Sequence, residues 1–218
     1  MSIKNIIKSL DFFSTLNDKN IDFLTSISCV NSYDKNYILH YEKKESNNFL
    51  FLVNGLAKAY KIDKHENEIF LYYIYNNTLL SEISNIKNDT LISFSNIKLI
   101  EDSQILTINY QEFKNHFLKK NLLCLEFANE VILRSEKLKS LINREFIFDS
   151  VAKVAMILSS DLDMFNKLKR HDISLMLHIQ PATLSRVLSR LKRNSIIDII
   201  HGKVSILNSS ALKEIYEE

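Results

Sequence analysis

The stretch 180–191, QPATLSRVLSRL, predicts a short helix with two unlike sides. Pro181 fits the first helical position, because the amide hydrogen that proline lacks is not needed there. One side is an apolar stripe whose members are three and four residues apart, as on a buried helix face. The stripe is Leu184, Val187, Leu188 and Leu191, and the opposite side is Ala182, Ser185, Arg186 and Ser189. That opposite side is short and polar with one long donor, so it suits close approach to a surface.

The flanking segments complete a helix-turn-helix with a wing. Residues 170–177, RHDISLML, predict a preceding helix, and His178 breaks its pattern. Residues 196–207, IIDIIHGKVSIL, predict two strands joined at His201-Gly202-Lys203. Two short helices joined by a tight turn are typical of a helix-turn-helix, whose second helix enters the DNA major groove.

In that arrangement three residues of the second helix are predicted to contact bases. Arg186 can donate two hydrogen bonds to guanine, Ser185 can donate or accept, and the Ala182 methyl group can touch a thymine methyl group. The predicted phosphate contacts are Thr183, Ser189, Arg190, Arg193 and Lys203. A merely solvated helix is the alternative for this face alone. The paired helix, the wing and the local charge favour DNA.

The charge is unevenly distributed along the chain. Between Met164 and Val204, eight Lys and Arg residues stand against Asp172 and Asp198, which gives this segment a formal charge of +6. The whole chain carries +2, so the remainder carries −4. A basic C-terminal module on an acidic body indicates a polyanionic partner.

The first half of the chain has a different periodicity. Helical spacing over residues 3–28 gives way, from about 37 to 109, to short β-rich runs separated by Asn, Asp, Lys and Ser. The runs are Tyr37–His40, Phe49–Val53, Leu56–Ile62, Ile69–Ile74, Leu91–Ser95, Ile97–Ile100 and Gln104–Asn109. Several short strands at this spacing predict an antiparallel barrel or roll.

From about residue 110 the helical period returns as a heptad seam. The seam is Phe117, Asn121, Cys124, Ala128, Val131, Ser135, Leu138 and Ile142, of which the last six are the predicted dimer interface. A second stripe, Leu118, Leu122, Leu125 and Ile132, is predicted to pack on the roll. The alternative is a helix buried wholly within its own chain.

A further helix is predicted from about Asp149 to Ser159, and we place the domain boundary near Asp149. The expected organisation is a sensor roll at 1–109, a dimerisation helix at 110–148 and a winged helix-turn-helix at 149–218. The fold class is therefore α+β.

Residues 170–207, RHDISLMLHIQPATLSRVLSRLKRNSIIDIIHGKVSIL, resemble the winged helix-turn-helix of the Crp–Fnr superfamily of bacterial transcription regulators. Thr183, the Ser185-Arg186 pair, the leucine stripe and the wing carry the resemblance, and Gly55 before a strand is its best mark in the roll. The resemblance implies a cyclic-nucleotide-binding-like β-roll, a long dimerisation helix and a homodimer that reads an inverted-repeat promoter site. RNA polymerase is a further partner that it leaves open.

Two departures from the family pattern lie in this region. Ala182 stands where the Fnr branch carries a glutamate, so we expect a half-site that keeps a G·C pair but is altered beside it. His178 stands where the family has a turn glycine, and a residue with a side chain there is expected in a less favoured, left-handed conformation.

The known effector signatures of the family are missing. Ser81-Glu82 stands at the phosphate turn, but no arginine precedes Arg134, so a cyclic nucleotide is disfavoured. One cysteine before residue 124 excludes a Cys-ligated iron–sulfur cluster. Haem stays open, because one histidine suffices, with His40, His65 and His116 as candidates. A redox or nitrosative signal, a small apolar ligand or no ligand at all stay open too.

Other classes are disfavoured by the sequence. The longest apolar run, Ile69–Ile74, is too short to span a bilayer and no signal peptide is recognisable, so we expect a cytoplasmic protein. Cys29 and Cys124 are interpreted as buried residues, with redox sensing as the alternative. No nucleophile turn surrounds Ser185 or Ser189, so no enzyme is expected. The competing function is a ligand-sensing or protein-docking module whose winged helix contacts protein.

Overall fold

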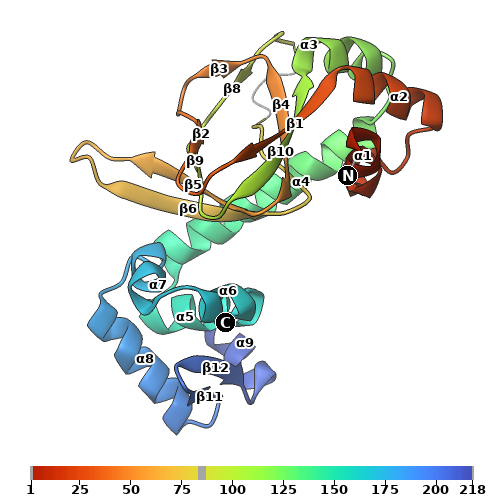
Figure 1. The fold of residues 1–218 in the computed structure, drawn as a ribbon. Helices are drawn as coiled ribbons and strands as arrows, with labels where there is room; N and C mark the ends of the chain where they lie inside the picture. The colour runs from red at the N-terminus through yellow and green to blue at the C-terminus, as the bar shows by residue number, and fades with distance from the viewer. Residues whose placement is uncertain (1, 83–86, 218) are drawn as a thin grey trace. The chain divides into compact units, whose positions relative to one another are not determined.

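A computed structural model describes residues 2–82 and 87–217 of the chain (Figure 1). Residue contacts divide it into a first unit, Met1–Glu136, and a second unit, Lys137–Glu218. This division falls inside helix α4 (Cys124–Ile142). The boundary near Asp149 stays a prediction.

The first unit is built on antiparallel sheets, as its short β-rich runs predict. One sheet has the order β1-β10-β4-β7, a second has the order β2-β9-β5-β6, and β3 pairs with β8. The strands are β1 (Ser28–Tyr33), β2 (Ile38–His40), β3 (Glu45–Ser46), β4 (Asn48–Asn54), β5 (Leu56–Ile62), β6 (Glu68–Tyr75), β7 (Thr78–Leu79), β8 (Leu91–Ile92), β9 (Asn96–Leu99) and β10 (Ser103–Asn109). Each of the seven predicted runs overlaps a strand. The sequence missed β1, β3 and β7, because β1 is polar and at most half-buried, and the other two have two residues each.

Helices pack on the β1-β10-β4-β7 sheet around an aromatic core. They are α1 (Ile3–Ser9), the 3₁₀ turn Asp11–Phe13, α2 (Asp18–Ser26) and α3 (Tyr110–Phe113). The helical spacing of apolar residues over 3–28 therefore belongs to the first three of these elements. Ser2 and Asn17 begin the two longer pieces by accepting hydrogen bonds from the amides of Asn5 and Asn20. The core brings Phe13, Phe49, Phe113 and Phe127 together, with 5.7 Å between the ring centroids of Phe49 and Phe127.

Helix α4 begins later than the heptad spacing predicts. A π-helical turn, Lys114–Leu118, follows α3, and Asn121 and Leu123 then take left-handed backbone angles, with φ of 57° and 61°. These angles interrupt the helix before Cys124. Phe117 is therefore part of the roll core and Asn121 part of the break, so including these two residues in the seam was wrong.

Gly55 lies between β4 and β5 in a conformation that favours glycine, with φ of 114°. A Cβ atom there would lie 2.2 Å from Ser103 Oγ and 3.0 Å from the Asp102 carbonyl oxygen. Gly55→Ala should lower the free energy of unfolding by about 2–4 kcal/mol, because strain adds to the clash. The matched control is Gly202→Ala, where φ is 79° but no atom lies within 4 Å, and it should cost about 1 kcal/mol. Equal urea midpoints for the two variants would contradict this account.

The second unit is a helical domain with a hairpin. It contains α5 (Ser150–Ser160), α6 (Leu162–Lys167), α7 (Arg170–Met176), α8 (Pro181–Arg193), β11 (Ile197–Ile200), β12 (Lys203–Ile206) and α9 (Ser209–Glu217). The helix predicted from Asp149 is α5, and Asp149 caps it by accepting from the amides of Val151 and Ala152. The sequence missed α6 and α9. Within residues 2–82 and 87–217, no helix has the length and apolarity needed to cross a membrane.

Candidate nucleic-acid interface

Helix α8 has the two sides that its sequence predicts. Leu184, Val187, Leu188 and Leu191 are buried, and Pro181 occupies the first turn. The predicted base contacts Ala182, Ser185 and Arg186 are exposed, as are Ser189, Arg190 and Arg193, whereas Thr183 is half-buried. The three residues predicted to contact bases thus share one exposed face. Arg190 and Thr183 lie on the flank of the helix, next to this face.

The wing is a tight hairpin held in place by side chains from α6 and α7. β11 and β12 pair antiparallel, and His201 and Gly202 both have positive φ, of 49° and 79°. Asn166 donates to the Val204 carbonyl (2.8 Å) and accepts from the Val204 amide (2.7 Å). Arg170 donates to the Gly202 carbonyl (2.6 Å). These contacts present Lys203 as an exposed cation at the wing tip.

The turn before α8 adopts the unusual conformation that the sequence indicates. His178 has φ of 50°, in the left-handed region. Its Nδ1 lies 2.7 Å from Glu145 Oε2, and Arg144 Nε donates to Glu145 Oε1 at 2.8 Å. Burial alone would raise the pKa of Glu145, but the hydrogen bonds from Arg144 and His178, with their charges, outweigh burial and lower it. The turn is also held by Lys153 Nζ, which donates to the Leu177 carbonyl (3.4 Å).

Substitution of His178 separates the backbone strain from the contact with Glu145. His178→Ala keeps the left-handed backbone angle and loses the contact with Glu145, so it should lower the free energy of unfolding by about 1 kcal/mol. His178→Gly loses the same contact but relieves the strain, so it should cost less than the alanine variant. Because the Glu145 pKa is lowered, its stabilising effect is present above its ordinary value of 4.5 and is lost as the pH falls below it. Urea unfolding at neutral pH compares the two variants, and a glycine variant less stable than the alanine variant would contradict the strain. Urea unfolding of the wild type at neutral and acid pH tests the effect of Glu145, and a free energy of unfolding that does not fall in acid would contradict it.

The predicted dimer face of α4 is exposed along its whole length. Cys124, Ala128, Val131, Ser135, Leu138 and Ile142 are all exposed in the single chain. Packing of Leu125 and Ile132 on the roll was a wrong prediction, since they are 70% and 58% exposed. Leu123 and Phe127 pack on the roll instead, because the break at Leu123 sets the rotation of α4. The prediction that both cysteines are buried was wrong too, because Cys29 and Cys124 are exposed.

An arginine of α4 contacts the turn at Ser81-Glu82. This contact was not predicted from the sequence. Arg134 Nη2 donates to the carbonyls of Ser81 (2.5 Å) and Leu79 (3.3 Å). Buried Glu82 accepts from Ser95 Oγ (2.9 Å) and from the Phe94 amide. Burial and the Glu82 carboxylate raise the pKa of Tyr72 to about 12, so its phenol keeps the proton. Residues of the roll and of α4 therefore hold the Glu82 carboxylate and the Arg134 guanidinium in place.

The three candidate haem ligands have different surroundings. His65 is exposed, and His116 stacks on Phe23 with its Nε2 3.2 Å from Asn20 Oδ1. His40 is 8% exposed, and its Nε2 has no hydrogen-bond partner among the described residues. Burial and the charge of Lys44 lower the pKa of His40 and so favour neutral imidazole. His40 and Lys44 both line a cavity of about 530 Å³.

Comparison with known proteins agrees with this geometry. Residues 153–215 match the family described as the Crp-like helix-turn-helix domain. No curated protein matches the chain. Among solved structures, FixK2 from Bradyrhizobium japonicum is 14% identical with a TM-score of 0.67, covering 87% of this chain and 97% of its own. A CooA mutant from Carboxydothermus hydrogenoformans is 19% identical with a TM-score of 0.72, covering 95% of each chain.

A third similar structure is described as a transcriptional regulator of the Crp/Fnr family from Eubacterium rectale. It is 17% identical with a TM-score of 0.63, covering 95% of this chain and 98% of its own. At these identities the likeness concerns the fold. The chain therefore carries a Crp-like helix-turn-helix domain at residues 153–215 and has the fold of the Crp–Fnr superfamily, as the resemblance in its sequence implied.

Proposed function

We propose that the protein is a homodimeric, sequence-specific transcription regulator that reads an inverted-repeat promoter site. The observation that carries the proposal is the exposed side of α8 with Ala182, Ser185 and Arg186, inside a Crp-like helix-turn-helix domain. A recognition helix of this type places its N-terminal residues at base edges in the major groove. The activity is binding, with no catalytic step.

The contacts divide into base recognition and phosphate binding. Arg186 donates two hydrogen bonds to guanine O6 and N7, Ser185 contacts the neighbouring base and Ala182 meets a thymine methyl group. Thr183, Ser189, Arg190, Arg193 and Lys203 contact phosphates, which fix the orientation of the domain on the duplex. Lys203 does so from the wing tip.

The dimer forms along the exposed seam of α4. Val131, Leu138 and Ile142 are 51%, 46% and 52% exposed and lie on one side of the helix with Ala128 and Ser135. Apolar side chains with this spacing are stabilised when a second copy of the helix covers them. A two-fold dimer requires a two-fold site, so the half-sites are inverted repeats about one helical turn apart. Binding to a promoter would bring the protein, in the cytoplasm, close to RNA polymerase, the partner that the resemblance leaves open.

Salt dependence of duplex binding distinguishes this proposal from a protein-docking module. Each phosphate neutralised by Lys or Arg releases counterions, so the logarithm of the affinity should fall linearly with the logarithm of the salt concentration. Fluorescence anisotropy with a labelled duplex measures the slope. Salt-dependent binding supports the regulator, whereas no binding at low salt would favour a winged helix that contacts protein.

For the effector, the structure favours a role for His40 over the other two histidines. The neutral imidazole of His40, with its unpartnered ring nitrogen, would hold the iron of a bound haem, and Lys44 on the same cavity would pair with a propionate. Haem would supply an iron centre that responds to redox or nitrosative signals. A cyclic nucleotide fits less well, because Glu82 is already satisfied by Ser95 and the Phe94 amide.

Haem titration of the purified protein tests this role. The wild type should develop a Soret band, His40→Ala should lose most of it, and His116→Ala should keep it, because His116 Nε2 already has Asn20 as a partner. No Soret band in the wild type, or an unchanged band in His40→Ala, would contradict the assignment.

A further inference from the structure

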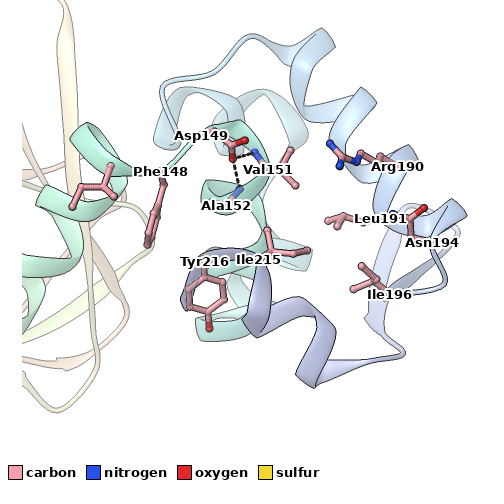
Figure 2. A pocket seen from close by; sticks show the side chains of 11 residues that line it. Phe148, Asp149, Val151, Ala152, Arg190, Leu191, Asn194, Ile196, Ile215 and Tyr216 are labelled. Atoms are coloured by element: carbon pink, nitrogen blue, oxygen red, sulfur yellow. Dashed lines mark hydrogen bonds between the residues drawn. The ribbon is translucent and has the colours of Figure 1, made fainter. Parts of the chain in front are cut away.

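A cleft of about 480 Å³ lies within the second unit, between the C-terminal half of α8 and the starts and ends of neighbouring helices (Figure 2). Val151 from α5, Leu191 from α8 and Ile215 from α9 provide apolar walls. The rings of Phe148 and Tyr216 line the same cleft, with their centroids 6.1 Å apart. An apolar cleft of this size can hold the tail of a small organic molecule.

One wall of the cleft is charged. Figure 2 shows the Arg190 side chain extending from α8 toward the start of α5, where Asp149 lies. The Asp149 carboxylate already accepts from the amides of Val151 and Ala152, at 2.9 and 2.8 Å. Among the described residues, no carboxylate forms an ion pair with Arg190. The cleft therefore combines apolar walls with a guanidinium whose donors are free for an anion.

We propose that this cleft binds an amphipathic organic carboxylate, with its head group on Arg190 and its apolar tail against Val151, Leu191 and Ile215. Guanidinium and carboxylate groups match in a bidentate geometry, which sets the orientation of the molecule. The tail gains by leaving water, and Phe148 and Tyr216 can lie against it. The charge of Arg190 favours a carboxylate over a neutral or cationic head group.

A ligand in this cleft should also affect DNA binding, an expectation that rests on the proposed function. Arg190 lies on the flank of α8 next to the base-contact face, where it is also proposed to contact a phosphate. A carboxylate in the cleft competes with that phosphate for the same guanidinium. The ligand should therefore weaken DNA binding by removing one phosphate contact per subunit and should reduce the salt slope.

Isothermal titration of the full chain with decanoate, below its micelle concentration, tests the site directly and without DNA. Decanoate should bind saturably with one site per chain, and decanol and decyltrimethylammonium should bind at least tenfold more weakly, since tenfold corresponds to about 1.4 kcal/mol for the head-group contact. Arg190→Gln should also lower the affinity for decanoate by about tenfold. No binding of decanoate, or equal binding of all three molecules, would overturn the site.

Two further variants keep the result interpretable. Arg193→Gln removes the same charge from the same helix without lining the cleft, so it should leave decanoate affinity unchanged. Val151→Phe should fill the cleft and reduce binding while Arg190 is intact, and a folded Val151→Phe protein with unchanged affinity would contradict the proposed position of the tail. DNA anisotropy with and without decanoate is then a separate readout. If decanoate binds but leaves the DNA affinity unaltered, the proposed competition between decanoate and DNA is wrong. If the protein does not bind DNA even without decanoate, the proposed function is contradicted instead.

Discussion

Arg186→Ala should lower the affinity for the specific DNA site by about 1–3 kcal/mol, which is roughly fivefold to more than a hundredfold. Arg186 is exposed on the outer side of α8, between Ser185 and the buried Val187, and its guanidinium can donate to both guanine acceptors. The loss should be confined to one base pair per half-site. Anisotropy titrations on a set of duplexes, each changed at one position, measure the affinity and the altered preference.

Lys203→Ala is the matched control for a cation that contacts a phosphate. Lys203 is exposed at the wing tip, so its loss should weaken binding to all duplexes alike and reduce the salt slope by about one. If Arg186→Ala weakened every duplex to the same degree, Arg186 would be a phosphate contact and the assigned base recognition would be wrong.

Leu138→Glu should raise the dissociation constant of the dimer by about two to four orders of magnitude. The side chain is 46% exposed in the single chain and lies on the seam with Val131 and Ile142. In a two-fold dimer both copies would bring a carboxylate into an apolar contact, and burying an uncompensated charge costs about 3–5 kcal/mol. Sedimentation velocity over a concentration series measures the shift, and DNA affinity should fall with it.

Leu133→Glu is the control for this substitution. Leu133 is 55% exposed on α4 but lies outside the seam, so the same change there should leave the dimer intact. Dissociation by both variants would place the dimer contact elsewhere on α4. Dissociation by neither would contradict the use of this helix as the interface.

The elements that carry the candidate site could be predicted from the sequence because their signals are local. Pro181 and the leucine stripe set the start and the buried side of α8, and the short His201-Gly202 turn sets the register of the wing. The left-handed angle at His178 was anticipated from the glycine that it replaces.

What could not be predicted depends on contacts between distant residues. Glu145 with His178, Arg134 with Ser81 and Arg170 with Gly202 are separated by 33, 53 and 32 positions, and no periodicity connects them. The start of α4 was missed because the heptad pattern continues through Asn121, whereas the backbone there turns left-handed. Helices α6 and α9 were missed because α6 has six residues and α9 has Leu212 as its one fully buried side chain.

The central claim is that α8 reads a two-fold DNA sequence, and selection from random duplex DNA by the purified, unliganded protein at near-physiological salt tests it most directly. We expect an enriched inverted repeat whose half-sites lie about one helical turn apart, with a G·C pair at the position of Arg186. The base next to it will show what Ala182 recognises. Absence of any enriched sequence, both without ligand and after repetition with haem and a nitric oxide donor, would contradict the account and favour a winged helix that docks on protein.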